Sequence, residues 1–210
     1  MDGRPRGDGM TKNATDLILR DRLQFTPNSS GEQGLLYGRF DLSDYTSALE
    51  RKGLSIKEVQ FQVRDPTNST LDNTGIWNQV AIASNAGSPT VMELAGFKVF
   101  ATTRAYEDAA DVGIASPDVL VIEEWQSYVT PFDGAIGLPG NVLVIHNKYG
   151  TPDLHPSGFP VVSDLLIGVA CDKWATSASA VLEIDIMLIA SPITITAKQL
   201  TEMLVQGQDQ

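Results

Sequence analysis

The stretch Ile56–Arg64, IKEVQFQVR, decides the fold, because polar and apolar side chains alternate along it. Successive side chains of a strand point to opposite faces. One face would carry Ile56, Glu58, Gln60 and Gln62, and the other Lys57, Val59, Phe61 and Val63. The pattern predicts a half-buried strand that ends at Asp65-Pro66.

Similar segments recur along the chain, separated by loops rich in Pro, Gly, Ser and Asp. Strands are predicted at Gly34–Leu42, Gly75–Ala83, Gly96–Ala105, Val119–Thr130, Asn141–Asn147, Leu165–Lys173 and Ala180–Ala190. In the last of these, Glu183 and Asp185 alternate with aliphatic residues, which indicates one wet and one dry face. About eight unevenly spaced strands favour an all-β protein, a two-sheet antiparallel sandwich with Greek-key connections.

Short helices are predicted at three places. After the first strand, Ser43 suits an N-cap and Gly53 the left-handed position beyond a helix end. A second short helix is predicted over Glu107–Val112. Near the C-terminus, Ser191-Pro192 interrupts the strand pattern, and Thr196 and Gln199 have the spacing of a capping box.

The C-terminal helix carries an apolar stripe of Leu200, Met203 and Leu204, and Gly207 ends it. A helix of about three turns is marginal alone, so it needs a surface to lie on. The chain therefore divides into an N-terminal arm over residues 1–32, a sandwich domain over residues 33–191, and a C-terminal helix and tail over residues 192–210. Positive and negative charges nearly balance in the arm.

The formal net charge of −11 disfavours nucleic-acid binding by the folded domain, because an acidic surface repels phosphate. Assembly of such a chain would need salt or cations for screening. No apolar run reaches the roughly 20 residues of a membrane helix. Residues Met1–Lys12 lack the apolar stretch of a secretory signal. We expect a soluble protein made in the cytoplasm.

No catalytic motif is recognisable. Candidate catalytic groups are His146, His155 beside Asp153, and Cys171, the single cysteine. A loop contact is the favoured interpretation for His155 and a core position for Cys171. We therefore predict no enzyme activity, no small-molecule substrate and no cofactor.

Other patterns are compatible with binding. Glu123 and Glu124 are neighbours and would lie on opposite faces of a strand, whereas Glu183 and Asp185 share a face and could hold a calcium ion between subunits. A solvated face is the favoured interpretation of that pair, and no metal is assigned to it. Core packing is favoured over a sugar-binding platform for Trp77, Trp125 and Trp174. Short-motif matches occur at Arg6-Gly7-Asp8 and, for N-glycosylation, at Asn13, Asn28 and Asn68.

An arm, about eight strands, a short helix between early strands and a C-terminal appendage together resemble a single jelly-roll viral capsid protein. The resemblance is one of architecture and is carried by GLLYGRFDL, KEVQFQVRD and LEIDIMLIA. It implies a subunit that tiles an icosahedral shell by contacts with copies of itself and with other capsid proteins. It also implies location in the virion after synthesis in the host cytoplasm. The near-neutral arm departs from the basic arm of many such shells, which leaves room for an underlying membrane.

Two other functions are weighed against the shell subunit. A non-enzymatic carbohydrate-binding or adhesin-like sandwich predicts an exposed row of aromatic residues or a calcium site in the loops. An enzyme of the cupin type needs several histidine and carboxylate ligands that converge on a metal.

Overall fold

The computed structural model describes residues 16–68, 73–79, 93–129, 142–150 and 158–206. Within these residues the chain forms nine strands, two short 3-10 helices and one α-helix. The strands are β1 (Leu17–Phe25), β2 (Gln33–Phe40), β3 (Lys52–Arg64), β4 (Glu93–Thr102), β5 (Val119–Val129), β6 (Val142–Tyr149), β7 (Phe159–Val161), β8 (Leu165–Asp172) and β9 (Leu182–Thr194). The helices are η1 (Ala109–Asp111), η2 (Ala175–Ser177) and α1 (Ala197–Gln206).

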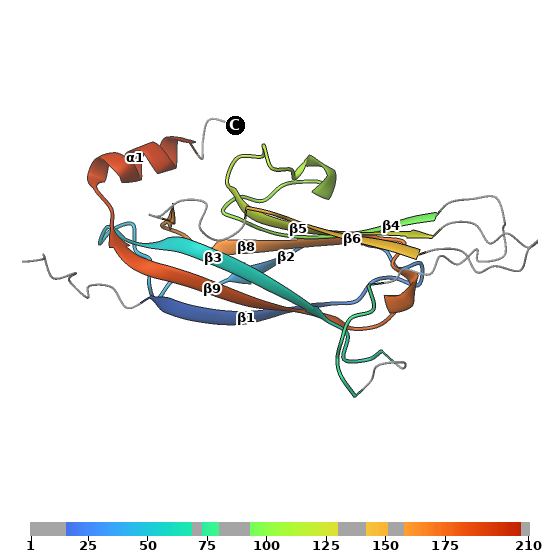
Figure 1. The fold of residues 1–210 in the computed structure, drawn as a ribbon. Coiled ribbons are helices and arrows are strands. Elements are labelled where there is room, and N and C mark those ends of the chain that lie inside the picture. The colour runs from blue at the N-terminus through green and yellow to red at the C-terminus, as the bar shows by residue number, and fades with distance from the viewer. Residues whose placement is uncertain (1–15, 69–72, 80–92, 130–141, 151–157, 207–210) are drawn as a thin grey trace, which may run out of the picture.

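The strands form two antiparallel sheets that pack face to face (Figure 1). One sheet has four strands in the order β1-β9-β3-β7, and the other has five in the order β2-β8-β4-β5-β6. With β6 set aside, each sheet has four strands, and their order is that of a double Greek key. This is the jelly roll, so the predicted all-β sandwich is confirmed.

A cluster of aromatic side chains fills the space between the sheets. Trp77 stacks on Trp174 with ring centroids 4.8 Å apart, and Phe97 lies 4.8 Å from Trp77. Trp125 packs edge-on against Trp77 at 5.3 Å. Aliphatic residues from both sheets continue this core, including Leu54 and Ile167.

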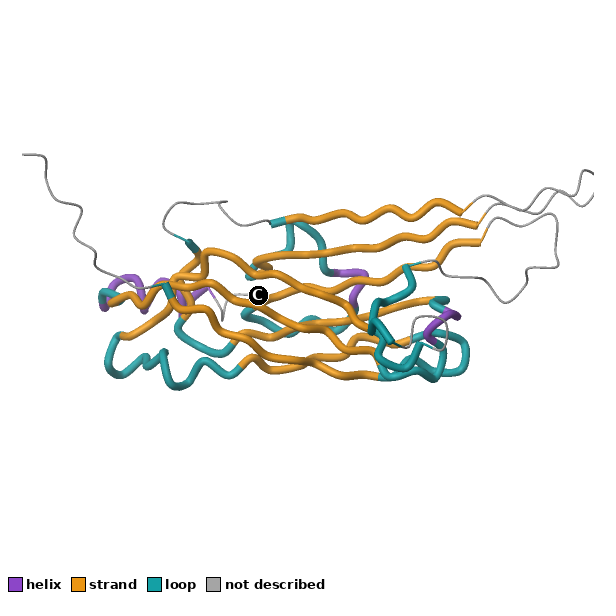
Figure 2. Tube along the Cα trace, turned by 60° about the horizontal axis from the view of Figure 1, so that its bottom comes forward, coloured by secondary structure: helices purple, strands orange, loops and turns teal. Residues whose placement is uncertain are grey.

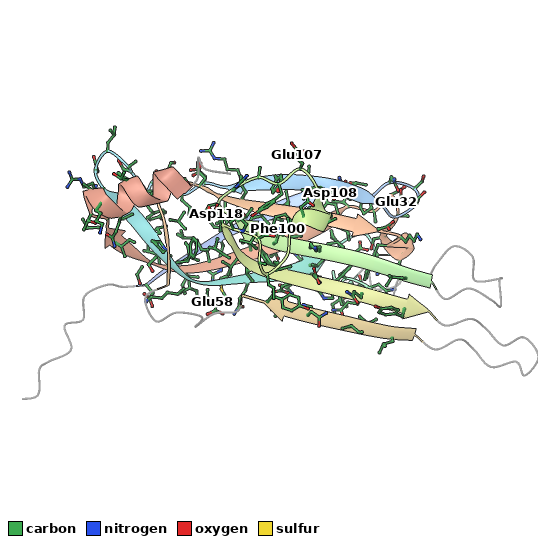
Figure 3. All side chains as sticks on the ribbon, turned by 90° about the horizontal axis from the view of Figure 1, so that it is seen from above. Glu32, Glu58, Phe100, Glu107, Asp108 and Asp118 are labelled. Carbon is green, nitrogen blue, oxygen red and sulfur yellow. The ribbon has the colours of Figure 1, made fainter. Side chains whose placement is uncertain are left out.

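A smaller core lies on the outer face of the five-stranded sheet. Phe100 and Ile122 point outward there and are buried with Val112 by the connection between β4 and β5. Figure 3 shows Phe100 beneath this connection, which carries Glu107, Asp108 and Asp118. The helix predicted over Glu107–Val112 is present as the single turn η1, with Asp108 as its N-cap.

The strand predictions hold for β2, β3, β4, β5, β6, β8 and β9 within a few residues of each end. The predicted assignment of Ile56 to the same face of β3 as Glu58 is wrong. Ile56 pairs with Ala190 and Glu58 with Ile189, so Lys57 is an extra residue in the ladder. This bulge shifts the alternation by one residue and turns Ile56 into the core beside Val59.

The arm predicted over residues 1–32 is wrong for residues 17–25, which form β1 along β9. Asp16 fixes the beginning of this strand, because its carboxylate accepts hydrogen bonds from Lys57 at 2.6 Å and Ser191 at 2.6 Å. The Lys57 and Ser191 hydrogen bonds hold the pKa of Asp16 below its ordinary value.

The helix predicted between Ser43 and Gly53 is replaced by turns and an isolated bridge from Ser47 to Lys52. The left-handed backbone lies at Arg51, with φ of 55°, and not at Gly53. Gly53 belongs to β3, where a Cβ would stand 2.5 Å from Ile195 and 2.7 Å from the Val161 carbonyl oxygen. The glycine therefore serves a close approach between strands and not a helix end.

Two further boundaries differ from the prediction. The strand predicted over Gly75–Ala83 is a loop over residues 75–79, with one bridge from Ile76 to Arg64, and its remainder lies outside the described residues. β9 continues through Ser191-Pro192 to Thr194. Its ladder with β1 stops at Ala190, and a proline is tolerated where a strand lacks a neighbour on one side.

The C-terminal helix is confirmed as α1, and its capping box is formed. The Thr196 N–H donates to Gln199 Oε1 at 3.1 Å, and the Gln199 N–H donates to Thr196 Oγ1 at 3.2 Å. Figure 1 shows α1 beyond the end of β9, to one side of the sandwich. Leu200 is half-buried, and the side chains of Met203 and Leu204 lie outside the described part.

Candidate functional site

The three tryptophans lie in the core, as the sequence predicts. Trp77, Trp125 and Trp174 are 4 %, 4 % and 0 % exposed. The Trp174 indole N–H donates to the Asn78 carbonyl oxygen at 3.1 Å. Tryptophans buried in this way offer no stacking surface to a sugar, so this part of the fold does not form a carbohydrate platform.

Cys171 is a core residue, again as predicted. Its thiol is buried in β8 and lies 3.6 Å from the Gly31 carbonyl oxygen. Burial raises the pKa of Cys171 from 9.0 to about 12. A nucleophilic cysteine needs a stabilised thiolate, and this environment favours the neutral thiol.

Glu123 joins the other histidine candidate in a cluster of charges on the inner face of β5 and β6. The Glu123 side chain is 1 % exposed and accepts from Lys148 Nζ at 2.7 Å. Its other oxygen lies 3.0 Å from His146 Nε2, and the His146 ring stacks on Trp125 at 4.3 Å. We name Glu123, His146 and Lys148 the Glu123 cluster.

The contacts within the Glu123 cluster are those of a buried ion pair that stabilises the fold. Burial of a carboxylate is costly unless cations and hydrogen bonds compensate its charge, and Lys148 supplies that compensation here. His146 is therefore held by contacts with Glu123 and Trp125 of the same chain. The neighbouring Glu124 points to the opposite face, as predicted, and pairs with Lys98 at 3.2 Å.

Glu183 and Asp185 share the outer face of β9, as predicted, but arginines of the same chain occupy the space a cation would take. Arg22 lies 2.5 Å from Asp185 and 3.4 Å from Glu183. Arg64 reaches Glu183 at 3.3 Å from the other side. The pair is therefore neutralised within the subunit by guanidinium groups from β1 and β3.

Several sequence candidates lie outside the described residues: Arg6-Gly7-Asp8, Asn13, Asp153 and His155. Asn28 is described, and its side-chain oxygen accepts from the Ser30 and Glu32 N–H groups in a turn. In the described ranges, no group of three or more His, Cys, Asp or Glu side chains is arranged to hold a metal ion. None of the helices in those ranges is both long and apolar enough to cross a membrane.

The sequence missed the partners of Glu123, because His146 and Lys148 lie more than twenty residues away. A signal was present in principle. The two side chains are two residues apart on one strand and so share a face. The hairpin register, which places Lys148 opposite Glu123, was the missing fact.

The structure's other candidate surfaces are the edges of the two sheets. A strand at a sheet edge leaves one row of backbone N–H and C=O groups unpaired. Among the strands that the structure describes, those at the edges are β1 and β7 in one sheet and β2 and β6 in the other. Leu143 on β6 and Ile18 on β1 are apolar side chains exposed at these edges, at 57 % and 52 %.

No protein-family model matches the chain, and no curated protein matches it in sequence. The solved structures similar to this chain include two viral capsid proteins. VP1 of Merkel cell polyomavirus, in complex with GD1a oligosaccharide, aligns over 84 % of this chain and 96 % of its own with 8 % identity and a TM-score of 0.32. The Desmodium yellow mottle tymovirus structure aligns over 94 % of this chain and 93 % of its own with 12 % identity and a TM-score of 0.24.

Proposed function

We propose that this chain is a structural virion protein, a subunit that assembles with copies of itself into an icosahedral shell. The observation that carries the proposal is the jelly-roll strand order around a filled interior. Jelly rolls occur in viral shells, in lectins and in cupins. The filled interior argues against the cupin use, and the burial of the tryptophans argues against a sugar-binding use.

A cupin holds its metal between the sheets, and here Trp77, Trp125, Trp174 and Phe97 occupy that space. A carbohydrate-binding sandwich presents aromatic side chains to solvent, and these tryptophans are buried. The fold therefore offers its outer surfaces and edges for interaction. Contacts through outer surfaces are what a shell subunit requires.

The acidity of the chain supports a shell in which the folded domain does not bind the genome directly, because a net charge of −11 repels phosphate. The proposal places the protein in the virion after synthesis in the host cytoplasm. Other capsid proteins and an underlying membrane remain compatible partners.

The experiment is assembly of the purified full chain, followed by size-exclusion chromatography with light scattering and by negative-stain electron microscopy. Salt and calcium are varied independently, with magnesium as the control for divalent charge. We expect closed particles of uniform diameter under screened conditions. A strict monomer under every condition, together with the absence of particles from a native source, would overturn the proposal. Specific hits on a glycan array would favour the carbohydrate-binding alternative.

A further inference from the structure

The four sheet edges differ in how well they are protected against pairing with another chain. Natural edge strands avoid such pairing by being short, by carrying bulges or by placing a charge on the face that points inward. β7 is three residues long. β2 has an irregular register against β8 between Gln33 and Leu36.

The edge strand β1 is protected by charge. Asp21 pairs with Ile186, a core residue, so Asp21 occupies a position on the inward face of the strand, where it remains exposed. Arg20 and Arg22 flank it on the outward face. A second sheet approaching this edge would have to bury the Asp21 charge.

β6 is neither short nor bulged, and its inward-facing cation Lys148 is already paired with Glu123 of the same chain at 2.7 Å. The strand runs for eight residues, VLVIHNKY, without proline, aspartate or glutamate. Its ladder with β5 is regular from Val142 to Tyr149. Leu143, 57 % exposed, and Ile145 give the outer face of β6 an apolar surface.

The cations of β6 do not protect its edge either. His146 and Lys148 lie on the inner face of β6, where both contact Glu123. The outer face of the strand therefore carries no charged side chain. β6 is also the strand that gives this sheet five members against the four of the other sheet. Figures 2 and 3 show β4, β5 and β6 side by side, with β6 at the margin of the molecule.

We propose that β6 is the docking edge for a second copy of this chain. The β6 strands of two copies pair antiparallel about a two-fold axis, so that one sheet runs through both subunits. Main-chain hydrogen bonds supply the attraction, and the outer-face side chains Leu143 and Ile145 pack across the axis. The interface is isologous, because each copy contributes the same strand.

The charge pattern of β6 favours a second copy as the occupant, because this strand carries Lys148 and no aspartate or glutamate. Two chains of net charge −11 repel each other, and this repulsion is weakest at a contact strand that has no anionic side chain. In a pairing centred on Ile145, Lys148 of one copy faces Val142 of the other. This register places no like charges opposite each other on the paired strands. Such an arrangement of like charges would be destabilising.

This inference deepens the shell proposal and rests on it for its biological role. Its test uses two variants of the full chain, Leu143→Lys on β6 and Ile18→Lys on β1. The two replaced side chains are matched, since both are aliphatic, lie on edge strands and are exposed by 57 % and 52 %. Circular dichroism and urea midpoints establish that each variant is folded.

Sedimentation equilibrium at roughly 1 M salt, where the Debye length is about 3 Å, measures dimerisation. We expect wild type and Ile18→Lys to dimerise alike, and Leu143→Lys to dimerise at least about tenfold more weakly, because the substitution enters the two-fold contact twice. Amide hydrogen exchange of the wild-type protein tests the same contact without any substitution. The amides of residues 142–149 should exchange more slowly as protein concentration rises, while those of residues 17–25 should not.

Equal dimerisation of both variants, or exchange over residues 142–149 that is independent of concentration, would overturn the β6 contact. A wild-type chain that stays monomeric at every concentration would overturn it too, even if its β6 captured another peptide. The two proposals fail separately. Particles that form normally with Leu143→Lys would refute β6 pairing and leave the shell intact, whereas a β6-dependent dimer without particles would refute the shell alone.

Discussion

At the scale of single residues, Glu123 shows how a charge is kept inside this sandwich. Lys148 and His146 come from the neighbouring strand and surround its carboxylate. We expect Glu123→Gln to lower the free energy of unfolding by about 1–3 kcal/mol, because the amide no longer compensates Lys148. Urea unfolding measures this change.

Glu107→Gln is the control, since Glu107 is exposed and undergoes the same chemical change. Its free energy of unfolding should shift by no more than about 0.5 kcal/mol. Equal effects of the two substitutions would show that the Glu123 cluster contributes no more than a surface charge.

Cys171 allows a test of burial without mutation, because it is the single cysteine. Its pKa is raised from 9.0 to about 12 in the folded state, so the folded protein retains the thiol proton more strongly than the unfolded chain does. Stability is therefore unaffected below about pH 9 and falls as the pH rises toward 12. At pH 8 a disulfide reagent should label the native protein far more slowly than the urea-unfolded protein. Equal labelling rates would contradict the buried position.

Some residues could be assigned from the sequence and others could not. Cys171 and the tryptophans were predictable as core, because apolar strand segments bury their inward side chains. The ion pairs of Glu183 and Glu123 were not predictable. Each depends on which strands are neighbours and in what register, and that information lies in contacts between distant parts of the chain.

At the scale of elements, Gly168 on β8 illustrates packing that a strand pattern cannot reveal. A Cβ at Gly168 would stand 2.2 Å from the ring of Phe100, whereas a Cβ at Gly96, on the same outer face, would meet nothing within 4 Å. We expect Gly168→Ala to destabilise the protein by about 1–3 kcal/mol through overpacking. Thermal unfolding measures the effect.

Gly96→Ala is the matched control, and its stability should be unchanged or slightly higher because alanine reduces the entropy of the unfolded chain. A stable Gly168→Ala protein would mean that Phe100 can move aside. The small outer core beneath the β4–β5 connection would then be loosely packed.

The element predictions failed where local and distant preferences conflict. Ser43 and Gly53 favour a helix locally. Gly53 instead lies in β3, where a larger residue would collide with Val161 and Ile195. In β1, the consecutive charges Arg20, Asp21 and Arg22 hide the alternation that the sequence would otherwise display. Strong alternation, as in β3 and β9, was sufficient to predict a strand.

At the scale of the whole molecule, a net charge of −11 makes ionic strength a control on association. The Debye length falls from about 30 Å at 0.01 M salt to about 3 Å at 1 M. We expect the association constant of the full chain to rise across this range. Static light scattering against salt concentration measures it. Association that weakens with salt would show that opposite charges, and not apolar or main-chain contacts, hold the copies together.

The pairing of β1 with β9 joins the first described strand to the last. During synthesis, β1 and β3 must wait for residues 182–194 before their common neighbour exists. At about 5–20 residues per second, this delay lasts about 6–34 seconds on the ribosome. The nascent chain therefore completes its four-stranded sheet only after β9 has emerged, and until then β1 and β3 are candidates for chaperone binding.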